Sequence, residues 1–417
     1  MAKLSMYLPP FASDYSGACS ALFGLNCLVI VIDAGCCTRN YVEYDELRWR
    51  KCRKSTFSAQ LRTLDAVLGD DARILDQTIE AVEALHPSCV ALVGTPVPAI
   101  VGMDVRGMAR EVECRCGMPA FGLPTTGFDT YEHGTSLALE ALCRRFAGGI
   151  DAAQKPLDDC ILHGKSCGFA RPRVNVLGAT PHDFMGEEHL RALEECVLSE
   201  GFDIAWSTTR PYGLGDVSRA AQADASLVVS WSGLAAARFL RDRFGVPFAV
   251  GSPVERAGAD AAAAGLRAAI AGEGSRDAAY AAGQGRQECS CAARVLIVGE
   301  HVAANALRST LRARFLRSGK TPTVSVASFF SMEPSWIEPG DFQIESELDL
   351  VRYGQQHPEM LFVGDPLLRR IPGFENAVAL ELPHEAVSST LFARDAVLPG
   401  ADMDRAIERF VECCIKA

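Results

Sequence analysis

Short apolar runs alternate with longer segments of helical spacing along most of the chain. In the first third, the runs predict strands at residues 28–33, 89–94 and 118–123 and helices at 57–69 and 76–85. The strand segments are continuously apolar, whereas apolar residues recur every three or four positions in the helical ones. This alternation is typical of βαβ units, in which helices cover a parallel sheet.

Two further units of the same layout follow. In the second unit we expect strands at 173–178, 202–206, 227–231 and 248–250 and helices at 187–199 and 234–244. In the third we expect strands from 293 and at 323–327, 361–364 and 377–382, with helices at 304–317 and 402–415. Segments 148–169 and 257–285 are expected to connect the units. The pattern therefore predicts an α/β protein of three doubly wound, Rossmann-like domains at residues 1–150, 170–282 and 292–417.

Composition narrows the class of partner. The chain has 417 residues, of which 48% are hydrophobic and 22% charged, and its net charge is -11. A negative chain of this kind is not expected to bind nucleic acid or an anionic membrane. Its longest apolar run, 21–32, is interrupted by Gly24 and Asn26 and is shorter than the roughly 20 residues that span a bilayer. The first ten residues carry no signal-peptide pattern, so we expect a cytoplasmic protein.

Three of the sixteen cysteines stand apart from the rest. Cys19 follows Gly17 near the start of a short helix, where backbone N–H groups stabilise a thiolate. Cys36 and Cys37 follow Gly35 just after a strand, so the two segments can face a common point. Such thiolates suit a soft metal or an iron–sulfur cluster better than a closed zinc site, which requires four local ligands. Buried structural thiols remain the alternative.

The cysteine segment resembles a known family. Gly17-Ala-Cys19, Gly35-Cys36-Cys37 and Asn40-Tyr41 are similar to the N-terminal cluster region of the nitrogenase component 1 superfamily, which includes nitrogenase, dark-operative protochlorophyllide reductase and nickel-sirohydrochlorin reductase subunits. Weaker matches follow in order at residues 94–104, 117–119, 126–134, 175–178, 244–247, 364–366 and 383–388. The resemblance therefore covers most of the chain.

The resemblance implies a fold and a chemistry. The three domains would surround a central cleft, as in nitrogenase component 1. Cys19 and Cys37, with Cys36 as the alternative to Cys37, would hold a 4Fe–4S cluster shared across an interface with a second copy or a sister subunit. A nitrogenase iron protein-like ATPase would deliver low-potential electrons, and a small-molecule substrate would bind in the cleft. His384 lies near the position of the family's cofactor histidine, so it is expected to donate protons in the cleft or to bind an anionic substrate.

Departures from the family narrow the function. The loop that would carry a third cluster cysteine reads Gly94-Thr95-Pro96, and the cofactor cysteine of nitrogenase would fall near Val229 and Ser230. These differences argue against dinitrogen reduction with an iron–molybdenum cofactor. The first hypothesis is therefore a nitrogenase-like reductase component. An assembly scaffold for a cluster or cofactor, without turnover, is the alternative, and a cluster-free binding protein is the third possibility.

Several weaker candidates complete the picture. The cysteine pairs 114/116, 289/291 and 413/414 have no further ligand nearby in sequence and are expected to be incidental. Two polar pairs at strand exits, His182-Asp183 and Tyr131-x-His133, belong either to the cleft or to ordinary structure. Arg39, beside Cys37, is expected to tune a cluster or to contact a partner.

Overall fold

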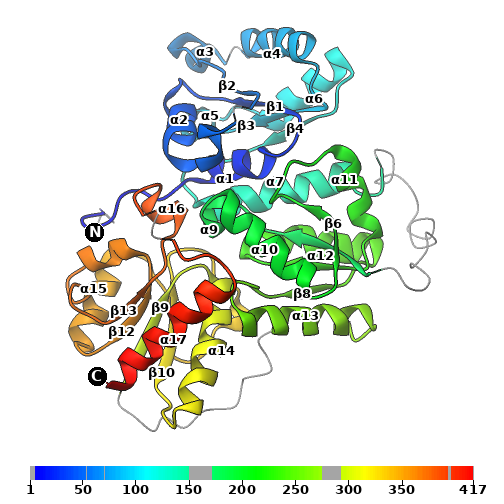
Figure 1. Cartoon of the computed structure of the whole chain (residues 1–417). Helices are drawn as coiled ribbons and strands as arrows, with labels where there is room; N and C mark the ends of the chain where they lie inside the picture. Colours follow the sequence, from blue (N-terminus) through cyan, green and yellow to red (C-terminus); the bar gives the residue numbers. More distant parts are fainter. Residues whose placement is uncertain are drawn as a thin grey trace.

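The computed structural model describes residues 5–149 except 53 and 70, and residues 171–274, 293–392 and 396–416. Within these residues the strands form three separate sheets, and every pair of neighbouring strands in them is parallel. The first sheet lies at the top of Figure 1, the second at the right and the third at the lower left. The predicted α/β architecture with several parallel sheets is confirmed. In the described residues, no helix combines the length and apolarity needed to cross a bilayer.

The first sheet has the order β2-β1-β3-β4. Its strands are β1 (Cys27–Val31), β2 (Thr56–Ser58), β3 (Cys89–Val93) and β4 (Ala120–Leu123). Every residue of β1 and β3 is buried, which explains their unbroken apolar runs, because helices cover both faces of such a sheet. The covering helices are α1 (Asp14–Leu22), α4 (Ala72–Leu85), α6 (Val105–Cys116) and α7 (Tyr131–Phe146). Shorter helices are α2 (Cys36–Asn40), α3 (Thr63–Leu68) and α5 (Pro96–Val101).

One predicted helix in this unit is wrong. Residues 57–69 form the edge strand β2 and then the short helix α3, with Gln60 between them at a φ of +50°. The strand pairs with β1 for only three residues, starting at Val29 and Thr56. An edge strand this short buries little, as the 45% exposure of Phe57 shows. It therefore leaves no apolar run in the sequence that would distinguish it from a helix.

The second sheet follows the prediction closely. Its order is β6-β5-β7-β8, with β5 (Arg173–Leu177), β6 (Asp203–Ser207), β7 (Ala225–Val228) and β8 (Phe248–Val250). Its helices are α9 (Pro181–Phe184), α10 (Glu187–Ser199), α11 (Leu214–Arg219), α12 (Leu234–Phe244) and α13 (Arg256–Ile270). The predicted bounds of β8, α10 and α12 match the structure. The chain leaves β7 earlier than expected, because a 3₁₀ turn forms at Trp231–Gly233.

The third sheet has the order β11-β10-β9-β12-β13. Its strands are β9 (Arg294–Val298), β10 (Thr323–Ser328), β11 (Phe342–Gln343), β12 (Leu361–Gly364) and β13 (Ala379–Glu381). Its helices are α14 (His301–Arg317), α15 (Glu347–Gln356), α16 (Glu385–Ser388) and α17 (Ala401–Lys416). The predicted elements are present, although α14 begins three residues earlier than expected because Glu300 caps it. The two-residue strand β11 was not predicted.

Helix α7 joins the first and second units. It crosses α1 so closely that a Cβ on Gly17 would lie 1.9 Å from the Tyr131 carbonyl oxygen, and a Cβ on Gly134 would lie 1.7 Å from that of Asp14. One apolar cluster then extends from α1 through Leu139 of α7 to α12. The two units therefore share a core. The predicted domain boundaries fall largely outside the described residues and stay a prediction.

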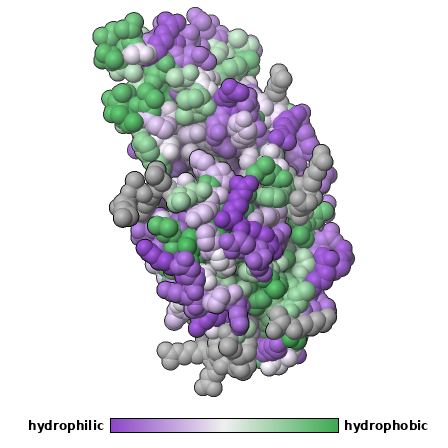
Figure 2. Space-filling model, turned by 90° about the vertical axis from the view of Figure 1, so that its left-hand side faces the viewer, coloured by the Kyte–Doolittle hydropathy of each residue, from purple (hydrophilic) through white to green (hydrophobic). Residues whose placement is uncertain are grey.

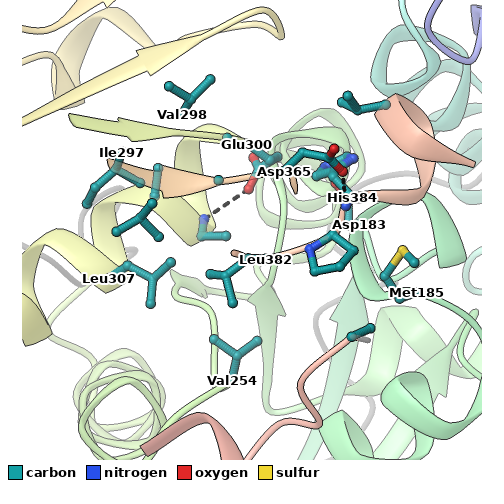
Figure 3. Close-up of a pocket in the computed structure, with 18 of the residues that line it drawn as sticks. Asp183, Met185, Val254, Ile297, Val298, Glu300, Leu307, Asp365, Leu382 and His384 are labelled. Atoms are coloured by element: carbon teal, nitrogen blue, oxygen red, sulfur yellow. Dashed lines mark hydrogen bonds and ion pairs between the residues drawn. The ribbon is translucent and has the colours of Figure 1, made fainter. Parts of the chain in front are cut away.

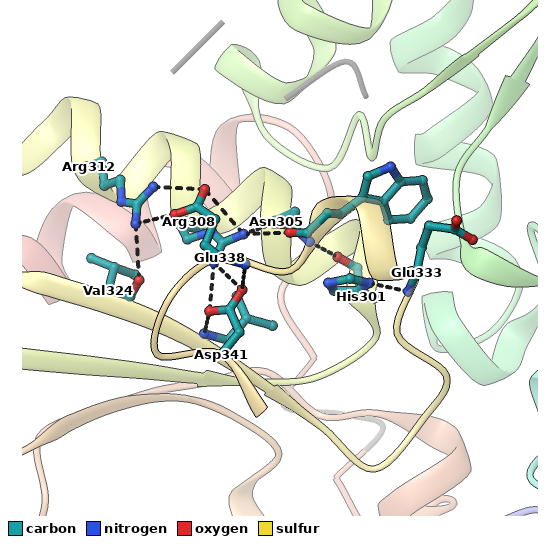
Figure 4. Close-up of polar contacts among 10 residues, drawn as sticks. His301, Asn305, Arg308, Arg312, Val324, Glu333, Glu338 and Asp341 are labelled. Carbon is teal, nitrogen blue, oxygen red and sulfur yellow. Dashed lines mark hydrogen bonds and ion pairs between the residues drawn. The ribbon is translucent and has the colours of Figure 1, made fainter. Parts of the chain in front are cut away.

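A buried ion-pair network holds the segment between β10 and β11 against α14 (Figure 4). The Arg308 guanidinium donates to both carboxylate oxygens of Asp341, at 2.7 and 2.6 Å, and the Arg312 guanidinium donates to Glu338 at 2.8 Å. Asp341 also accepts from the backbone N–H groups of Val326 and Glu338, at 2.7 and 2.8 Å. The charges of Arg308 and Asp341 therefore each have an opposite charge and further hydrogen bonds. Such partners offset the free-energy cost of burying an ion.

Candidate cysteine loop and cleft

The cysteine loop follows β1 and is held by Asp33. Gly35 adopts a φ of +103°, which favours glycine, and directly precedes α2. The Asp33 carboxylate accepts from the Thr38 backbone N–H at 2.8 Å and from the Thr38 and Ser58 hydroxyls at 3.0 and 2.6 Å. These bonds fix the tight turn that the sequence predicted at Gly35. They present Cys36 as an exposed thiol and Cys37 as a partly buried one.

Cys36, Cys37 and Asp33 could share a metal ion. One ligand atom from each residue lies within 4.8 Å of the others. Among the described residues, these three form the group of cysteine, histidine and acidic side chains that is close enough to share a metal ion. Asp33 already accepts three hydrogen bonds, so the two sulfur atoms are the better ligands. A 4Fe–4S cluster is held by four thiolates. The loop therefore fits half of such a site, and the remaining ligands would come from elsewhere.

Cys19 lies deeper than the loop. It is buried on α1 with 2% of its surface exposed, and its neighbour Ser20 donates to Glu46 at 2.9 Å. Cys37 packs against the apolar cluster that contains Tyr15, one turn before Cys19, and Cys19 itself. The structure thus places α1 against the cysteine loop, but no three-residue metal group in the described chain includes Cys19. The predicted Cys19–Cys37 pairing stays a prediction.

Both thiols are protonated in the metal-free chain. Burial raises the pKa of Cys19 far above its usual value, and the carboxylates of Glu46 and Asp33 add to the effect. Burial, followed by the nearby Cys36, raises the pKa of Cys37 to about 12. The nearest cation in sequence, Arg39, is mostly exposed and pairs with Glu43 at 3.1 Å. Metal binding here would therefore release protons, as thiolate ligation requires.

The second candidate site is a cavity of about 130 Å³ between the second and third units (Figure 3). It lies beyond the carboxyl ends of β9, β12 and β13, and residues 183–185 of the segment after β5 close it from the other side. Crevices at this edge of parallel sheets are the usual ligand sites of such folds. This position agrees with the central cleft that the family resemblance implied.

Asp183 and His384 meet at the wall of this cavity. The Tyr131 hydroxyl donates to Oδ1 of Asp183, and Nε2 of His384 lies 3.8 Å from the same oxygen. Oδ2 of Asp183 and both ring nitrogens of His384 have no partner among the described residues. The Ser230 hydroxyl is near Asp183 but donates to the Gly178 carbonyl oxygen at 2.7 Å. Buried polar atoms without partners are rare and point to a missing ligand or water.

Burial shifts the charge states of this pair. It lowers the pKa of His384 to about 3, with a further contribution from His182. It raises the pKa of Asp183 well above its usual value, and the nearby Glu300 carboxylate adds to the rise. The His384 ring, stacked on Phe330 at 5.0 Å, is therefore neutral at neutral pH. It can donate one hydrogen bond and accept another.

Glu300 and Asp365 support the site from the third sheet. Glu300 caps α14, accepting from the Ala303 N–H at 2.9 Å, and also accepts from the Trp231 N–H at 2.8 Å. Burial raises its pKa to about 7, against the lowering effect of these backbone bonds. Asp365 accepts from the backbone N–H of His384 at 2.8 Å and so positions that residue. The sequence analysis missed Glu300, although an acid between a strand and a helix start was a usable signal.

Side chains predicted from separate strand exits come together at the cleft. The His182 ring lies 5.0 Å from that of Tyr131, whose hydroxyl reaches Asp183, and the Tyr131 ring lies 5.8 Å from His384. Burial lowers the pKa of His182 to about 4. His133 lies apart from this group, because its Nε2 contacts the Ser331 hydroxyl at 3.0 Å on the exposed side. The catalytic role of His384 stays a prediction.

The two other cysteine pairs that the structure describes are not brought to either site. The Cys116 thiol donates to the Val112 carbonyl oxygen at 3.0 Å within α6, while Cys114 is exposed. Cys414 packs in the core of the third unit beside exposed Cys413. Cys289 and Cys291 lie outside the described residues.

Comparison with known proteins gives a consistent family. The family model for nitrogenase component 1 type oxidoreductases matches residues 13–302. A solved structure of nitrogenase Cp1 at pH 6.5 superposes with a TM-score of 0.69, covering 100% of this chain and 95% of the other at 12% identity. A second, at pH 5, gives a TM-score of 0.61 at 13% identity, covering 100% and 90%. At these identities the two structures establish the fold alone.

Two curated relatives are nitrogenase iron-molybdenum cofactor biosynthesis proteins NifE. The protein from Methanosarcina barkeri is 23% identical over 199 residues, which is 47% of this chain and 41% of the relative. The protein from Sinorhizobium fredii (strain NBRC 101917 / NGR234) is 29% identical over 100 residues, 24% of this chain and 20% of the relative. The chain thus matches less than half the length of either relative.

Proposed function

The chain belongs to the nitrogenase component 1 type oxidoreductases, and from this premise we propose that it is the substrate-reducing component of a nitrogenase-like reductase. The observation that carries the proposal is the enclosed cleft, in which buried Asp183 and His384 retain atoms without partners. A separate thiol pair, Cys36 and Cys37, lies in the first unit. A reductase of this family type needs both features, an electron entry point and a dry substrate site.

Cys19 and Cys37, with Cys36 as the alternative to Cys37, would hold an iron–sulfur cluster, which when bound supplies single low-potential electrons. Because two cysteines are half of the four ligands, a second copy or a sister subunit would complete the site. Exposed apolar side chains in the same unit support a protein partner. They include Leu64, Val67 and Leu68 of α3 and Ile100 and Val101 of the adjoining α5. Figure 2 shows hydrophobic surface at the upper left of the molecule. An iron protein-like ATPase would supply the electrons, and we place the reaction in the cytoplasm.

The chain's own groups would handle protons in the cleft. Glu300, with a pKa raised to about 7, can release or accept a proton near neutral pH. Neutral His384 can donate one hydrogen bond to a bound molecule, and Tyr131 holds Asp183 beside it. The apolar remainder of the wall excludes water, which strengthens these polar interactions.

Electron acceptance can be tested by EPR. Protein purified without oxygen is reduced with dithionite, and its low-temperature spectrum is compared with that of a Cys36→Ala/Cys37→Ala double variant. The proposal expects a reduced iron–sulfur signal in the wild type and its loss in the double variant. Cys114→Ala/Cys116→Ala removes two thiols from α6 instead and should keep the signal. A signal that survives in the first double variant would contradict the proposal.

A second function, cofactor or cluster assembly, is favoured by the two NifE relatives, which are named for iron–molybdenum cofactor biosynthesis. An assembly scaffold would release its cluster, whereas a reductase would retain it. The reconstituted protein is therefore mixed with an apo-ferredoxin, and iron transfer is followed by absorption. Transfer within minutes would support the scaffold, and retention would support the reductase.

A further inference from the structure

The cleft cavity has one polar end and one apolar end. Figure 3 shows Asp183, Glu300 and His384 close together at one side, while aliphatic side chains such as Leu307 and Leu382 line the other. Such pockets bind a ligand whose apolar body packs against the aliphatic side chains. Its few polar atoms then hydrogen-bond to the polar side chains gathered at the other end. The cavity is thus shaped for a molecule with a single polar head.

Its size limits that molecule. The cavity volume is about 130 Å³, close to the roughly 150 Å³ of an apolar protein cavity that binds benzene. A ligand of about six non-hydrogen atoms in the body is therefore the right scale. A tetrapyrrole or a large metal cofactor would need the cleft to open.

The polar end favours some charges over others. Asp183 is only 4% exposed, and its Oδ2 has no partner among the described residues. Whether that carboxyl is ionised or protonated, it offers no positive charge. The oxygens of Glu300 and Asp365 are already engaged by backbone N–H groups. No lysine or arginine is among the described residues that line the cavity. An anion placed here would lose its hydration without gaining a cationic partner.

We infer that the cleft binds a small molecule with an apolar body of about six non-hydrogen atoms and an uncharged or cationic hydrogen-bond-donating head, as in an alcohol or an amine. The head donates to Oδ2 of Asp183 and contacts the His384 ring, and carboxylates are excluded. This inference deepens the proposed function, on which it rests for the fate of the ligand, by naming the class of substrate.

Three matched probes test the inference: hexylamine, 1-hexanol and heptanoate, which share a six-carbon alkyl body and differ in the charge of the head. Binding to the full chain is measured by ligand-observed NMR and by calorimetry at neutral pH, without iron or reductant. We expect the amine and the alcohol to bind and heptanoate to bind at least about tenfold more weakly, the effect of a single unfavourable charge contact. Equal or tighter binding of heptanoate would overturn the inference.

Variants locate the binding. Leu307→Phe fills the apolar end and should weaken both favoured probes at least about tenfold. Leu316→Phe makes the same change on the exposed side of α14, where Leu316 is 57% exposed, and should leave binding unchanged. Should Leu307→Phe fail to fold, Ala303→Leu narrows the cavity from a partly buried position. The inference would be overturned if the affinities of both favoured probes were unchanged in these wall variants. It would also be overturned if neither favoured probe bound to the wild type.

Asp183→Asn tests the polar end. It keeps the shape of the side chain and removes the carboxylate charge that a bound ammonium group would stabilise, so it should weaken hexylamine several-fold more than 1-hexanol. Equal effects on the two probes would contradict the assigned contact. Because these measurements contain no iron, a chain that binds the amine but never accepts electrons would refute the proposed function alone. A chain that holds a reducible cluster but binds neither probe would refute the ligand class alone.

Discussion

Two buried polar regions lie along helix α14, and they differ in how their groups are satisfied. Around Arg308, each charge meets an opposite charge and backbone donors, as in the pair with Asp341 at 2.6 Å. Near the start of the same helix, Asp183 of α9 and His384, which precedes α16, are also largely buried. Both keep polar atoms that have no partner among the described residues. A saturated network stabilises a fold, whereas an unsaturated one costs free energy unless something else binds. The contrast therefore indicates that the region around Arg308 stabilises the fold, whereas the region around Asp183 and His384 is the candidate ligand-binding site.

The largest expected effect is in the saturated region. Asp341→Asn should lower the free energy of unfolding by about 3 kcal/mol, because it removes the bidentate countercharge of the buried Arg308 guanidinium. Glu338, at 3.4 Å from Arg308, is then its remaining carboxylate among the described residues. Urea denaturation measures the change. Asp203→Asn, at an exposed strand end, is the control and should stay within about 0.5 kcal/mol of the wild type. A loss below about 1 kcal/mol for Asp341→Asn would mean that the network does not hold the segment.

The next effect is a pH dependence that Glu300 imposes on the unsaturated region. Its pKa is about 7 in the folded chain against a usual value of 4.5. Between these values the folded state binds more protons than the unfolded state, so stability falls as the pH rises through this window. The full effect is on the order of 3 kcal/mol. The groups that face Glu300 and share in the shift are Asp183 and Glu132.

Glu300→Gln should remove this slope. Unfolding by urea is compared for the variant and the wild type at about pH 5, near the lower end of the window, and at about pH 7.5, just above it. The variant should gain stability relative to the wild type as the pH rises. Its lost hydrogen bond costs the same at both pH values and cancels in the comparison. Parallel pH profiles would show that Glu300 is ionised throughout and is not a proton-handling group.

One substitution made in both regions tests the contrast directly. His384→Phe keeps the aromatic stack on Phe330 and removes two unpartnered nitrogens, so it should raise the unfolding free energy by about 1–2 kcal/mol. His301→Phe removes an acceptor that the Glu333 N–H uses at 2.9 Å, together with an Nε2 that has no partner among the described residues. Because the lost bond leaves a backbone donor unsatisfied, the variant should lower the unfolding free energy by about 1 kcal/mol. Thermal and urea unfolding give both values. If both substitutions changed the unfolding free energy in the same direction, the contrast between the two regions would be wrong.

The smallest effect should come from Asp183→Asn. The new amide oxygen still accepts from the Tyr131 hydroxyl, so the free energy of unfolding should change by less than about 1 kcal/mol. The identical substitution at Asp341 is the reference, measured under the same conditions. A loss at Asp183 as large as that at Asp341 would mean that its carboxylate has an essential structural partner.

Much of the fold followed from the sequence where burial is complete. The unbroken runs of β1 and β3 and the spacing in α10 and α12 predicted those elements, because covered parallel strands and amphipathic helices leave distinct patterns. Strands β2 and β11 left no such signal, since two or three residues at a sheet edge bury too little. The shared core at α7 was also invisible, because it depends on the close crossing at Gly17 and Gly134.

The site was predicted in its parts and not in its arrangement. Asp183 and His384 were chosen because each follows a strand, and parallel strands open toward one edge. Their contact depends on how the second and third sheets are placed, which no local pattern records. Glu300 was missed because it has two functions at once. It caps α14, and it also accepts a hydrogen bond from the backbone N–H of Trp231 in the second unit, which no local pattern predicts. In the cysteine loop, the structure adds Asp33, which the sequence analysis did not propose, beside Cys36 and Cys37. The pairing of Cys19 with Cys37 stays a prediction.

The central claim is that the cysteine loop holds an iron–sulfur cluster that serves the cleft. The most direct test is the iron and sulfide content of protein purified without oxygen, for the wild type beside Cys19→Ala and Cys37→Ala. The account predicts about two irons per chain, half of a shared four-iron cluster, and their loss in both variants. No iron in the wild type after reconstitution, or unchanged iron in the variants, would contradict it.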